Sequence, residues 1–266
     1  MSTRWFRTAV AGLAVAATAS LAACGGGSNA GNPRSGAASG RVSGDITVFA
    51  AASLTEPFTK IGKDFEAANP GTKVTFSFAG SSALATQISQ GAPADVFAAA
   101  SPATMKTVTD AGDSDGVPTI FVRNHLVIAV PKGNPKGING LADLTKPGVK
   151  VALCAEQVPC GAAAKRALAA AKVTLTPVTL EQDVKAALSK VRLGEVDAAL
   201  VYRTDADAAA SDVDGIEFLE SADAINDYPI VVLKNAPNKT AARAFVNYVL
   251  SDKGITVLIQ AGFQAP

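Results

Sequence analysis

The sequence predicts an α/β protein in which short buried strands alternate with amphipathic helices. Hydrophobic residues make up 48% of the 266 residues and charged residues 18%, a composition that excludes a largely disordered chain. Apolar runs of strand length recur, each followed by a stretch with helical periodicity. Alternation of this kind is typical of α/β sheets that are mainly parallel.

The first half of the body follows this pattern closely. Residues 46–50 form a short apolar run that predicts a buried strand. In the stretch 54–68, apolar residues recur at helical spacing, and Asn69-Pro70-Gly71 then ends the predicted helix. Strands are predicted next at 73–78 and 95–99, and helices at 82–90 and 102–111.

The second half repeats the alternation without an obvious internal repeat. The predicted strands are 125–131, 150–153, 198–202 and 229–233, and the predicted helices are 161–172, 181–193, 204–209, 240–250 and 253–261. Two of these strands, 125–131 and the last one extended to 228–233, bracket about a hundred residues of α/β pattern. We interpret them as hinge strands between two lobes, the first formed by 45–124 with 234–266 and the second by 125–233.

The first 23 residues have the features of a secretory signal peptide. Arg4 and Arg7 precede an apolar stretch from Thr8 to Ala22, and Leu-Ala-Ala-Cys closes it at Cys24. This ending resembles the bacterial lipobox, in which the cysteine becomes the lipidated first residue of the mature protein. We therefore expect an exported lipoprotein anchored to the outer face of the cell membrane through Cys24.

Residues 24–44 predict a flexible tether behind this anchor. The segment is rich in Gly and Ser and has no apolar periodicity. A tether of this kind lets a globular body move while it stays close to a membrane partner.

Small and hydroxyl residues gather at the predicted strand-to-helix junctions. Ligands of parallel α/β sheets bind at the carboxyl ends of the strands, where helix N-termini offer free N–H groups. Ser53 and Ser81 lie at two such junctions, and Tyr202 lies at another. Serine is also a common helix cap, so each junction taken alone has a purely structural explanation.

Taken together, the junctions resemble those of the periplasmic molybdate-binding proteins of ABC transporters. The resemblance rests on residues 46–55 (ITVFAAASLT), on 78–85 (FAGSSALA) and on 91–98 (GAPADVFA). The short segments around Val158, Val184 and Val201 follow in the family's order. The similarity covers roughly residues 45–266, and the first two motifs are specific as a pair.

The resemblance implies a type II periplasmic-binding-protein fold, with two α/β lobes joined by two hinge strands and the ligand in the cleft. It implies a monomer that captures molybdate, and tungstate as well, for an ABC permease. Ser53 and Ser81 would bind the oxyanion through hydroxyl and main-chain N–H, and Tyr202 through its phenol. Cys160 and Val184 would offer main-chain N–H only, and no other cofactor is implied. Cys160 departs from the alanine common in the family, which leaves the local loop shape open.

A donor set of this kind suits a fully deprotonated tetrahedral dianion. Hydroxyls, amides and a phenol can all donate, whereas hydrogen phosphate would leave its own proton unpaired at a cost of about 1–3 kcal/mol. A receptor of the same fold for sulfate or phosphate remains the alternative. We expect Glu56, Glu156, Glu181 and Asp183, which lie close to these junctions, to be solvated residues of the first helical turns.

The cysteines Cys154 and Cys160 predict a disulfide, because an exported protein meets an oxidising compartment. An alternative of another class is an exported thiol–disulfide oxidoreductase, but its usual C-x-x-C motif is not present in this sequence. A metal site is a weaker interpretation, since the chain has a single histidine, His125, in a predicted hinge strand.

Several other classes of function are disfavoured. A net charge of +1 does not favour nucleic acid as a partner. One histidine in a strand does not favour a Ser–His–Asp triad. The sequence has no G-x-x-x-x-G-K-[ST] phosphate loop, so ATP hydrolysis would belong to a partner. The sequence therefore predicts a binding protein and not an enzyme.

Overall fold

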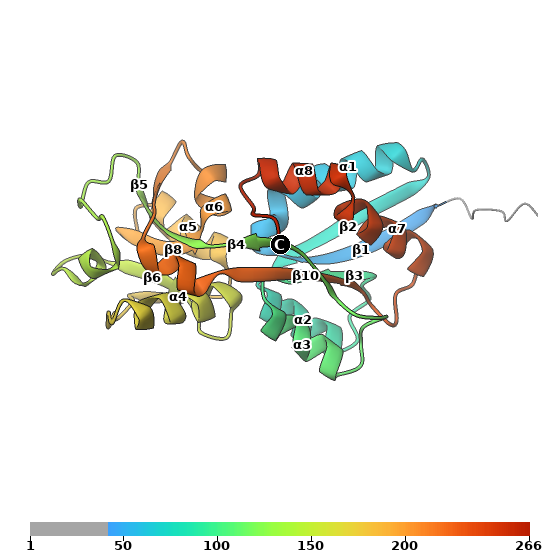
Figure 1. Cartoon of the computed structure of the whole chain (residues 1–266), viewed down its shortest axis with the longest axis horizontal. Coiled ribbons are helices and arrows are strands. Elements are labelled where there is room, and N and C mark those ends of the chain that lie inside the picture. Colours follow the sequence, from blue (N-terminus) through green and yellow to red (C-terminus); the bar gives the residue numbers. More distant parts are fainter. Residues whose placement is uncertain (1–41) are drawn as a thin grey trace, which may run out of the picture. The chain divides into compact units, whose positions relative to one another are not determined.

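The computed structural model describes residues 42–266, which form two α/β lobes, each built on a five-stranded sheet (Figure 1). The predicted signal peptide, Cys24 and most of the tether lie outside the described residues. Among residues 42–266, no helix combines the length and apolar character needed to cross a membrane.

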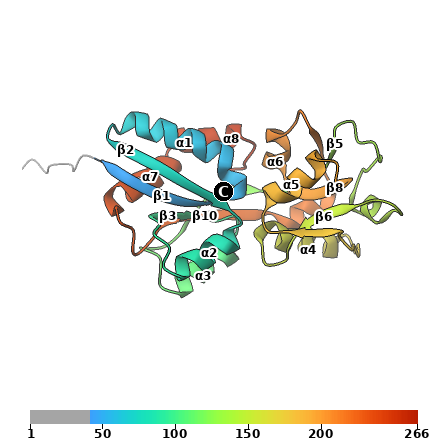
Figure 2. The same cartoon turned by 180° about the vertical axis from the view of Figure 1, so that it is seen from behind.

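The first sheet has the strand order β2-β1-β3-β10-β4. Its strands are β1 (Gly44–Ala51), β2 (Thr72–Ala79), β3 (Val96–Ala98), β4 (Thr119–Asn124) and β10 (Asn226–Val232). The helices packed on it are α1 (Thr55–Ala68), α2 (Ser81–Ser89), α3 (Pro102–Asp110), α7 (Lys239–Leu250) and α8 (Asp252–Gln260). This lobe is the one that carries α1, α2, α7 and α8 in Figure 2.

Strand alternation gives this sheet two buried faces. Successive side chains of β1 point to opposite faces, so Val48 packs in the cluster that holds Phe58, Phe65 and Phe245, whereas Phe49 packs in the cluster with Leu84 and Met105. The first cluster includes T-shaped aromatic pairs, with Phe65 and Phe245 centroids 5.4 Å apart. The sheet is therefore covered by helices on both faces, as the apolar strand runs predict.

The second sheet has the strand order β7-β6-β8-β5-β9. Its strands are β5 (Leu126–Pro131), β6 (Val151–Cys154), β7 (Thr179–Glu181), β8 (Ala198–Tyr202) and β9 (Val213–Ile216). Its helices are α4 (Pro159–Ala170), α5 (Val184–Arg192) and α6 (Arg203–Ala208). Short 3-10 helices complete the described chain: η1 (Ala52–Leu54), η2 (Leu141–Thr145) and η3 (Leu219–Ala224).

The expectation of mainly parallel sheets is confirmed, since four of the five strands in each sheet run in the same direction and one strand runs against them. Strands β1, β2 and β3 are parallel, as are β6, β7 and β8, but β10 and β5 run antiparallel to their neighbours in the respective sheets. The reason is the route of the chain. Each of these two strands enters its sheet directly from the other lobe, so it runs away from the lobe boundary while the parallel strands run toward it.

The chain passes between the lobes at two adjacent points. One lies between Asn124 of β4 and Leu126 of β5, and the other precedes Asn226 of β10, which pairs with Asn124. The pairing of β10 with β3 and β4 puts residues 226–232 in the first sheet. This differs from the predicted second lobe of 125–233, because residues 228–232 of the predicted hinge strand 228–233 belong to β10 beyond the crossing.

A predicted helix over 181–193 is too long at its start. Glu181 is the last residue of β7, and α5 begins at Val184 because the Asp183 carboxylate accepts a hydrogen bond of 2.8 Å from the Ala186 N–H. Asp183 is thus the N-cap. The strands β4, β7 and β9 were not predicted, since each is short or partly exposed.

The predicted disulfide is confirmed between Cys154 and Cys160, with Cα atoms 5.8 Å apart. Cys154 ends β6 and Cys160 is the second residue of α4, so the bond ties the end of a strand to the start of the following helix. Both cysteines are 2% exposed. They are therefore poorly placed for the exchange chemistry of an oxidoreductase, which needs an accessible thiol.

Loss of this disulfide should lower stability modestly. We expect the double variant Cys154→Ser with Cys160→Ser to lose about 2 kcal/mol in free energy of unfolding, because the closed loop is short. Urea denaturation of both proteins measures the difference. Reduction of the wild-type protein should give a similar loss, and a double variant as stable as the oxidised protein would contradict the prediction.

Candidate functional site

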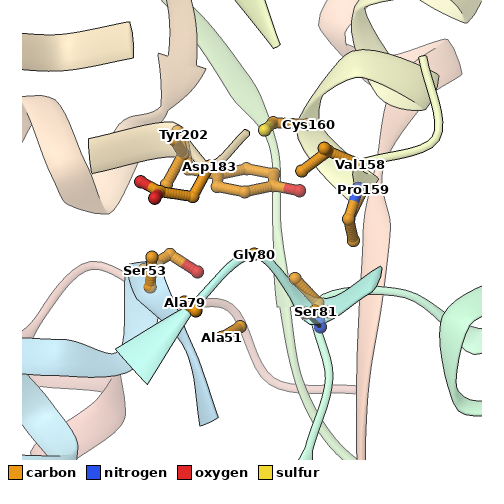
Figure 3. A pocket seen from close by; sticks show the side chains of 13 residues that line it. Ala51, Ser53, Ala79, Gly80, Ser81, Val158, Pro159, Cys160, Asp183 and Tyr202 are labelled. Carbon is orange, nitrogen blue, oxygen red and sulfur yellow. Dashed lines mark hydrogen bonds between the residues drawn. The ribbon is translucent and has the colours of Figure 1, made fainter. Parts of the chain in front are cut away.

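A narrow cleft lies where the two sheets end toward each other, with an empty volume of about 200 Å³ that includes open solvent at its mouth. It is lined by small and polar residues from both lobes: Ala51, Ala52, Ser53, Ala79, Gly80, Ser81 and Ala100 from the first, and Val158, Pro159, Cys160, Asp183, Val184 and Tyr202 from the second. Figure 3 shows Ser53 and Ser81 on one side of the cleft, with Tyr202 and Cys160 on the other.

Helix N-termini converge on this cleft. Ser81, Cys160 and Val184 stand in the first turns of α2, α4 and α5, and Ser53 stands in η1 just before α1. The first N–H groups of a helix have no partner within the helix, and the helix dipole puts partial positive charge there. The cleft is therefore suited to an anion, although no residue that lines it is Lys or Arg.

The two serine hydroxyls are held by neighbours within the first lobe. Ser81 Oγ accepts a 3.0 Å hydrogen bond from the Ala100 N–H, so the serine's own hydrogen is left to point elsewhere. Ser53 Oγ lies 2.9 Å from the Tyr228 hydroxyl, and either oxygen can be the donor. Both serines are almost fully buried, at 2% and 1% exposed for Ser53 and Ser81.

Tyr202 brings a phenol to the cleft from the end of β8. Burial raises the pKa of its hydroxyl far above the usual range, and the nearby Asp205 carboxylate adds to the shift. Burial also raises the pKa of Tyr228. Both phenols therefore keep their protons at neutral pH and can act as hydrogen-bond donors.

On the sequence alone, Glu56, Glu156, Glu181 and Asp183 are expected to be solvated residues of first helical turns. For Asp183 this expectation is wrong, because Asp183 is the one residue of the four that lines the cleft. Asp183 is half-buried, and its carboxylate is engaged by the Ala186 N–H as the cap of α5. Glu56 and Glu156 are exposed and paired with Lys185 and Lys165, respectively.

All five residues predicted to form a site line this one cleft: Ser53, Ser81, Cys160, Val184 and Tyr202. Sequence reasoning missed Asn226, a buried amide whose Nδ2 donates a 2.7 Å hydrogen bond to the Tyr202 hydroxyl. It also missed Gly80, where a side chain would collide with the backbone oxygen of Gln182 in the opposite lobe. Neither a strand asparagine nor a lone glycine before a helix carries a distinctive signal.

An ion-pair cluster links the lobes beside the cleft. Lys185 Nζ of α5 lies 2.8 Å from Glu56 Oε1 of α1 and 3.1 Å from Asp205 Oδ1 of α6. Asp205 is fully buried, and neither of its oxygens accepts a well-aligned hydrogen bond. Burial raises the pKa of Asp205 from 3.8 to about 6, although Lys185 opposes the shift. Burial alone would lower the pKa of Lys185, but the two carboxylates outweigh it and raise that pKa.

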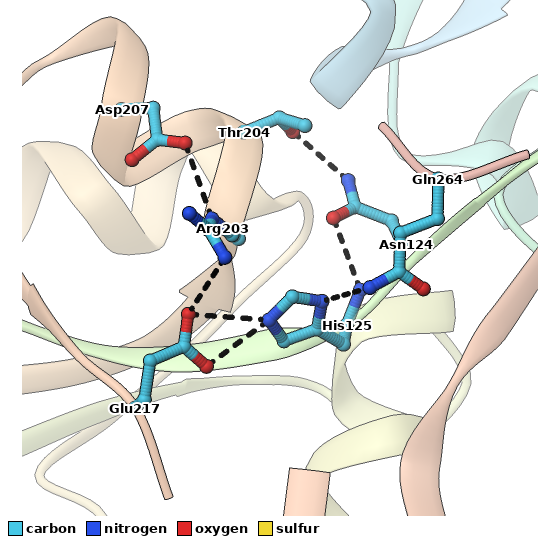
Figure 4. Close-up of polar contacts among 7 residues, drawn as sticks. All are labelled: Asn124, His125, Arg203, Thr204, Asp207, Glu217 and Gln264. Atoms are coloured by element: carbon cyan, nitrogen blue, oxygen red, sulfur yellow. Dashed lines mark hydrogen bonds and ion pairs between the residues drawn. The ribbon is translucent and has the colours of Figure 1, made fainter. Parts of the chain in front are cut away.

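His125 belongs to a hydrogen-bonded network at the first crossing between the lobes (Figure 4). Its Nε2 lies 3.1 Å from Glu217 Oε2, and its Nδ1 lies 3.2 Å from Gln264 Nε2. Because an amide nitrogen donates, Nδ1 is the acceptor and Nε2 carries the hydrogen. Within residues 42–266, no group of three or more His, Cys, Asp or Glu is arranged to hold a metal ion.

Comparison with known proteins decides the family. Residues 46–264 match the family of bacterial extracellular solute-binding proteins. The chain belongs to this family. A binding protein without enzymatic activity, as the sequence predicts, agrees with this membership.

Individual relatives agree with this assignment. The chain is 46% identical to the molybdate-binding protein ModA of Mycobacterium tuberculosis H37Rv, over 99% of this chain and 100% of that protein. It is 32% identical to a putative ABC transporter substrate-binding lipoprotein, YvgL, of Bacillus subtilis, over 83% and 86% of the two chains. These identities group this solute-binding protein with the ModA proteins.

A solved structure confirms the fold class. The periplasmic molybdate-binding protein of Azotobacter vinelandii superimposes with a TM-score of 0.69 over 83% of this chain and 99% of that one. At 19% identity this likeness shows the fold alone. It supports the two-lobed type II periplasmic-binding-protein fold that the sequence predicts.

The buried Asp205 should make this solute-binding protein more stable in mild acid. Its pKa is higher in the folded chain than in the unfolded one, so the folded chain binds the proton more tightly and this contribution is lost as pH rises through about 6. We expect the effect of Asp205→Asn on the free energy of unfolding to be more favourable at pH 7.5 than at pH 4, by about 2–3 kcal/mol.

Urea denaturation at both pH values measures this difference. Asp207→Asn, an exposed position nearby, is the matched control and should show the same small effect at both. An effect of Asp205→Asn on the free energy of unfolding that is the same at both pH values would contradict the raised pKa assigned to Asp205.

Proposed function

We propose that this solute-binding protein captures molybdate, and tungstate as well, in the cleft between its lobes and delivers the oxyanion to an ABC permease. The observation that carries the proposal is the convergence of three hydroxyls and three helix N-termini on a cleft lined by no Lys or Arg. Neutral donors and helix dipoles can hold a dianion and still release it. The ModA relative at 46% identity supports molybdate as the ligand.

The proposed contacts divide by chemistry. Ser53 and Ser81 bind oxygens of the anion through their hydroxyls and main-chain N–H groups. Cys160 and Val184 bind through main-chain N–H alone, which is compatible with their apolar, buried side chains. Tyr202 donates from its phenol. A cysteine at position 160 is tolerated because its sulfur is engaged by Cys154.

Donor-only contacts favour anions that carry no proton. Hydrogen phosphate would place its O–H against a donor, which costs about 1–3 kcal/mol when buried. An inward-facing carboxylate would accept that proton and reverse the preference. Asp183 is the one carboxylate that lines the cleft, and the Ala186 N–H already occupies one of its oxygens. Sulfate carries no proton, so molybdate is distinguished from it by the size of the cleft.

We also propose that the protein is a monomeric lipoprotein. Residues 1–23 would be removed on export, Cys24 would carry the lipid on the outer face of the cell membrane, and 24–44 would be the tether. The lipobox at Leu21–Cys24 supports this, as does the likeness to a putative substrate-binding lipoprotein of Bacillus subtilis. The first lobe would then comprise 45–124 and 226–266, and the second lobe 125–225, with the hinge at the two crossings.

Calorimetric titration tests the ligand. The chain from residue 24, with Cys24→Ser to prevent lipidation, is titrated with molybdate, tungstate, sulfate and phosphate at pH 7. Heat is the suitable signal because the single tryptophan, Trp5, lies in the predicted signal peptide. Tight one-to-one binding of molybdate and tungstate is expected. Tight binding of sulfate or phosphate instead would mean that the ligand is that anion and not molybdate. No binding of any of the four anions would refute the proposal.

Serine variants test the site in the same titration. Ser53→Ala and Ser81→Ala should each weaken molybdate binding by about 1–3 kcal/mol, because each removes a buried donor. Ser89→Ala, at an exposed position at the other end of α2, is the control and should bind like the wild type. Unchanged affinity in both cleft variants would show that the anion binds elsewhere.

Gly80→Ala tests whether binding needs the close approach of the lobes. Its Cβ would strike the backbone oxygen of Gln182, so the lobes should be held slightly apart and molybdate affinity should fall at least about tenfold. Gly140→Ala is the control, since a Cβ there meets open space. Equal affinities for Gly80→Ala and the wild type would mean that the lobes do not need to meet at this point.

A further inference from the structure

Asn226 joins the two lobes through one buried amide. It begins β10 in the first sheet and is 3% exposed. Its Nδ2 donates to the Ala100 backbone oxygen at 2.9 Å and to the Tyr202 hydroxyl at 2.7 Å. Ala100 and Tyr202 both line the cleft, one from each lobe, whereas Asn226 does not line it.

The surroundings of Asn226 fix which way its amide faces. The Arg166 guanidinium donates a 2.8 Å hydrogen bond to Oδ1. On the other side, the backbone oxygens of Ala100 and Pro159 lie 2.9 and 3.4 Å from Nδ2. A flipped amide would set its oxygen against two carbonyl oxygens and its NH₂ against a guanidinium, and neither arrangement can form a hydrogen bond. Nδ2 is therefore the atom that meets Tyr202.

A fixed donor at Tyr202 has a direct consequence for its hydroxyl. An amide NH₂ can only donate, so the phenol oxygen is the acceptor of this bond. The hydrogen of the phenol must then point in another direction. In Figure 3 the Tyr202 ring lies along the cleft with its hydroxyl toward Val158 and Pro159, so this hydrogen can reach a molecule in the cleft as well as the neighbouring Tyr228 hydroxyl.

We infer that Asn226 is a positioning residue that makes the Tyr202 hydroxyl an obligate hydrogen-bond donor toward the bound anion. The inference rests on the proposed function and deepens it, because it names a residue outside the cleft that sets what the cleft accepts. Arg166 acts behind Asn226 by holding its amide. An anion that presents a proton to Tyr202 meets a second donor and is disfavoured.

The same arrangement occurs at Ser81. There the Ala100 N–H donates to Oγ, which leaves the serine hydrogen to point elsewhere. Ala100 also accepts from Asn226 through its carbonyl oxygen. The backbone of Ala100 and the amide of Asn226 thus each donate to a hydroxyl oxygen that lines the cleft, one in each lobe, which leaves both hydroxyl hydrogens free to be donated elsewhere.

A double-mutant cycle tests the inference with molybdate as the probe. The proteins are the chain from residue 24 with Cys24→Ser, and the same chain with Asn226→Ala, Tyr202→Phe or both. Each single variant should bind molybdate about tenfold more weakly. If Asn226 acts through the phenol, the double variant should be less than about twofold weaker than Tyr202→Phe alone. The same loss from Asn226→Ala in both backgrounds would overturn the inference.

Asn124→Ala is the matched control for the cycle. Asn124 is the cross-strand partner of Asn226, is 1% exposed, and donates to Thr204. Its amide bonds Thr204 and the His125 N–H and not Tyr202, so its effect on molybdate binding should couple to Tyr202 much less than that of Asn226. Coupling of Asn124 to Tyr202 as strong as that of Asn226 would show a general disturbance of the crossing and would overturn the inference.

Tyrosine NMR tests the contact without any ligand. The chain has three tyrosines, so Cζ labelling gives three signals that the Phe variants assign. Asn226→Ala should shift the signal of Tyr202 and leave that of Tyr248 in place; an unshifted Tyr202 signal would overturn the inference.

The failure of this inference and the failure of the proposed function are distinguishable. A wild-type chain that binds none of the four anions would refute the proposed function itself, whereas normal wild-type binding with additive effects of Asn226→Ala and Tyr202→Phe refutes only the role of Asn226.

Discussion

The structure depends on one electrostatic constraint, which is that unpaired N–H groups from separate helices must meet at one place. A single helix N-terminus offers a few weak donors, and several of them aimed at one point make a strong site for negative charge. The fold achieves this by ending the parallel strands of both sheets at the lobe boundary. The helices that follow these strands then start there, as α2, α4 and α5 do. Small residues such as Gly80 let the two sets of helix ends approach closely.

The order of strands and helices could be predicted because it depends on local patterns. The apolar run at 46–50 and the helical face from Leu54 to Ala68 correspond closely to β1 and α1. Strand direction could not be predicted in the same way. Whether β10 runs parallel or antiparallel to β3 depends on the lobe from which the chain arrives, and no local pattern records that. The short edge strands β7 and β9 lack the apolar run of a buried strand.

Five of the residues that line the cleft could be predicted, but Gly80 and the residues behind the cleft could not. Ser53, Ser81 and Tyr202 stand at strand-to-helix junctions, where position along the chain already suggests a ligand, and the family resemblance adds Cys160 and Val184. Asn226 acts through contacts with residues 24 and 126 positions away in the chain. Its neighbours in sequence give no sign of them. Asp205 could not be predicted either, because its effect on stability comes from its burial next to Lys185 and Glu56, which lie far from it in the chain.

The two crossings between the lobes lie side by side, since Asn124 of β4 pairs with Asn226 of β10. Because the two crossings are adjacent, bending of the backbone at this one place is enough to change the angle between the lobes. Under the proposed function, a permease that touches both lobes can distinguish an empty protein from a loaded one by this angle, whatever the chemistry inside the cleft.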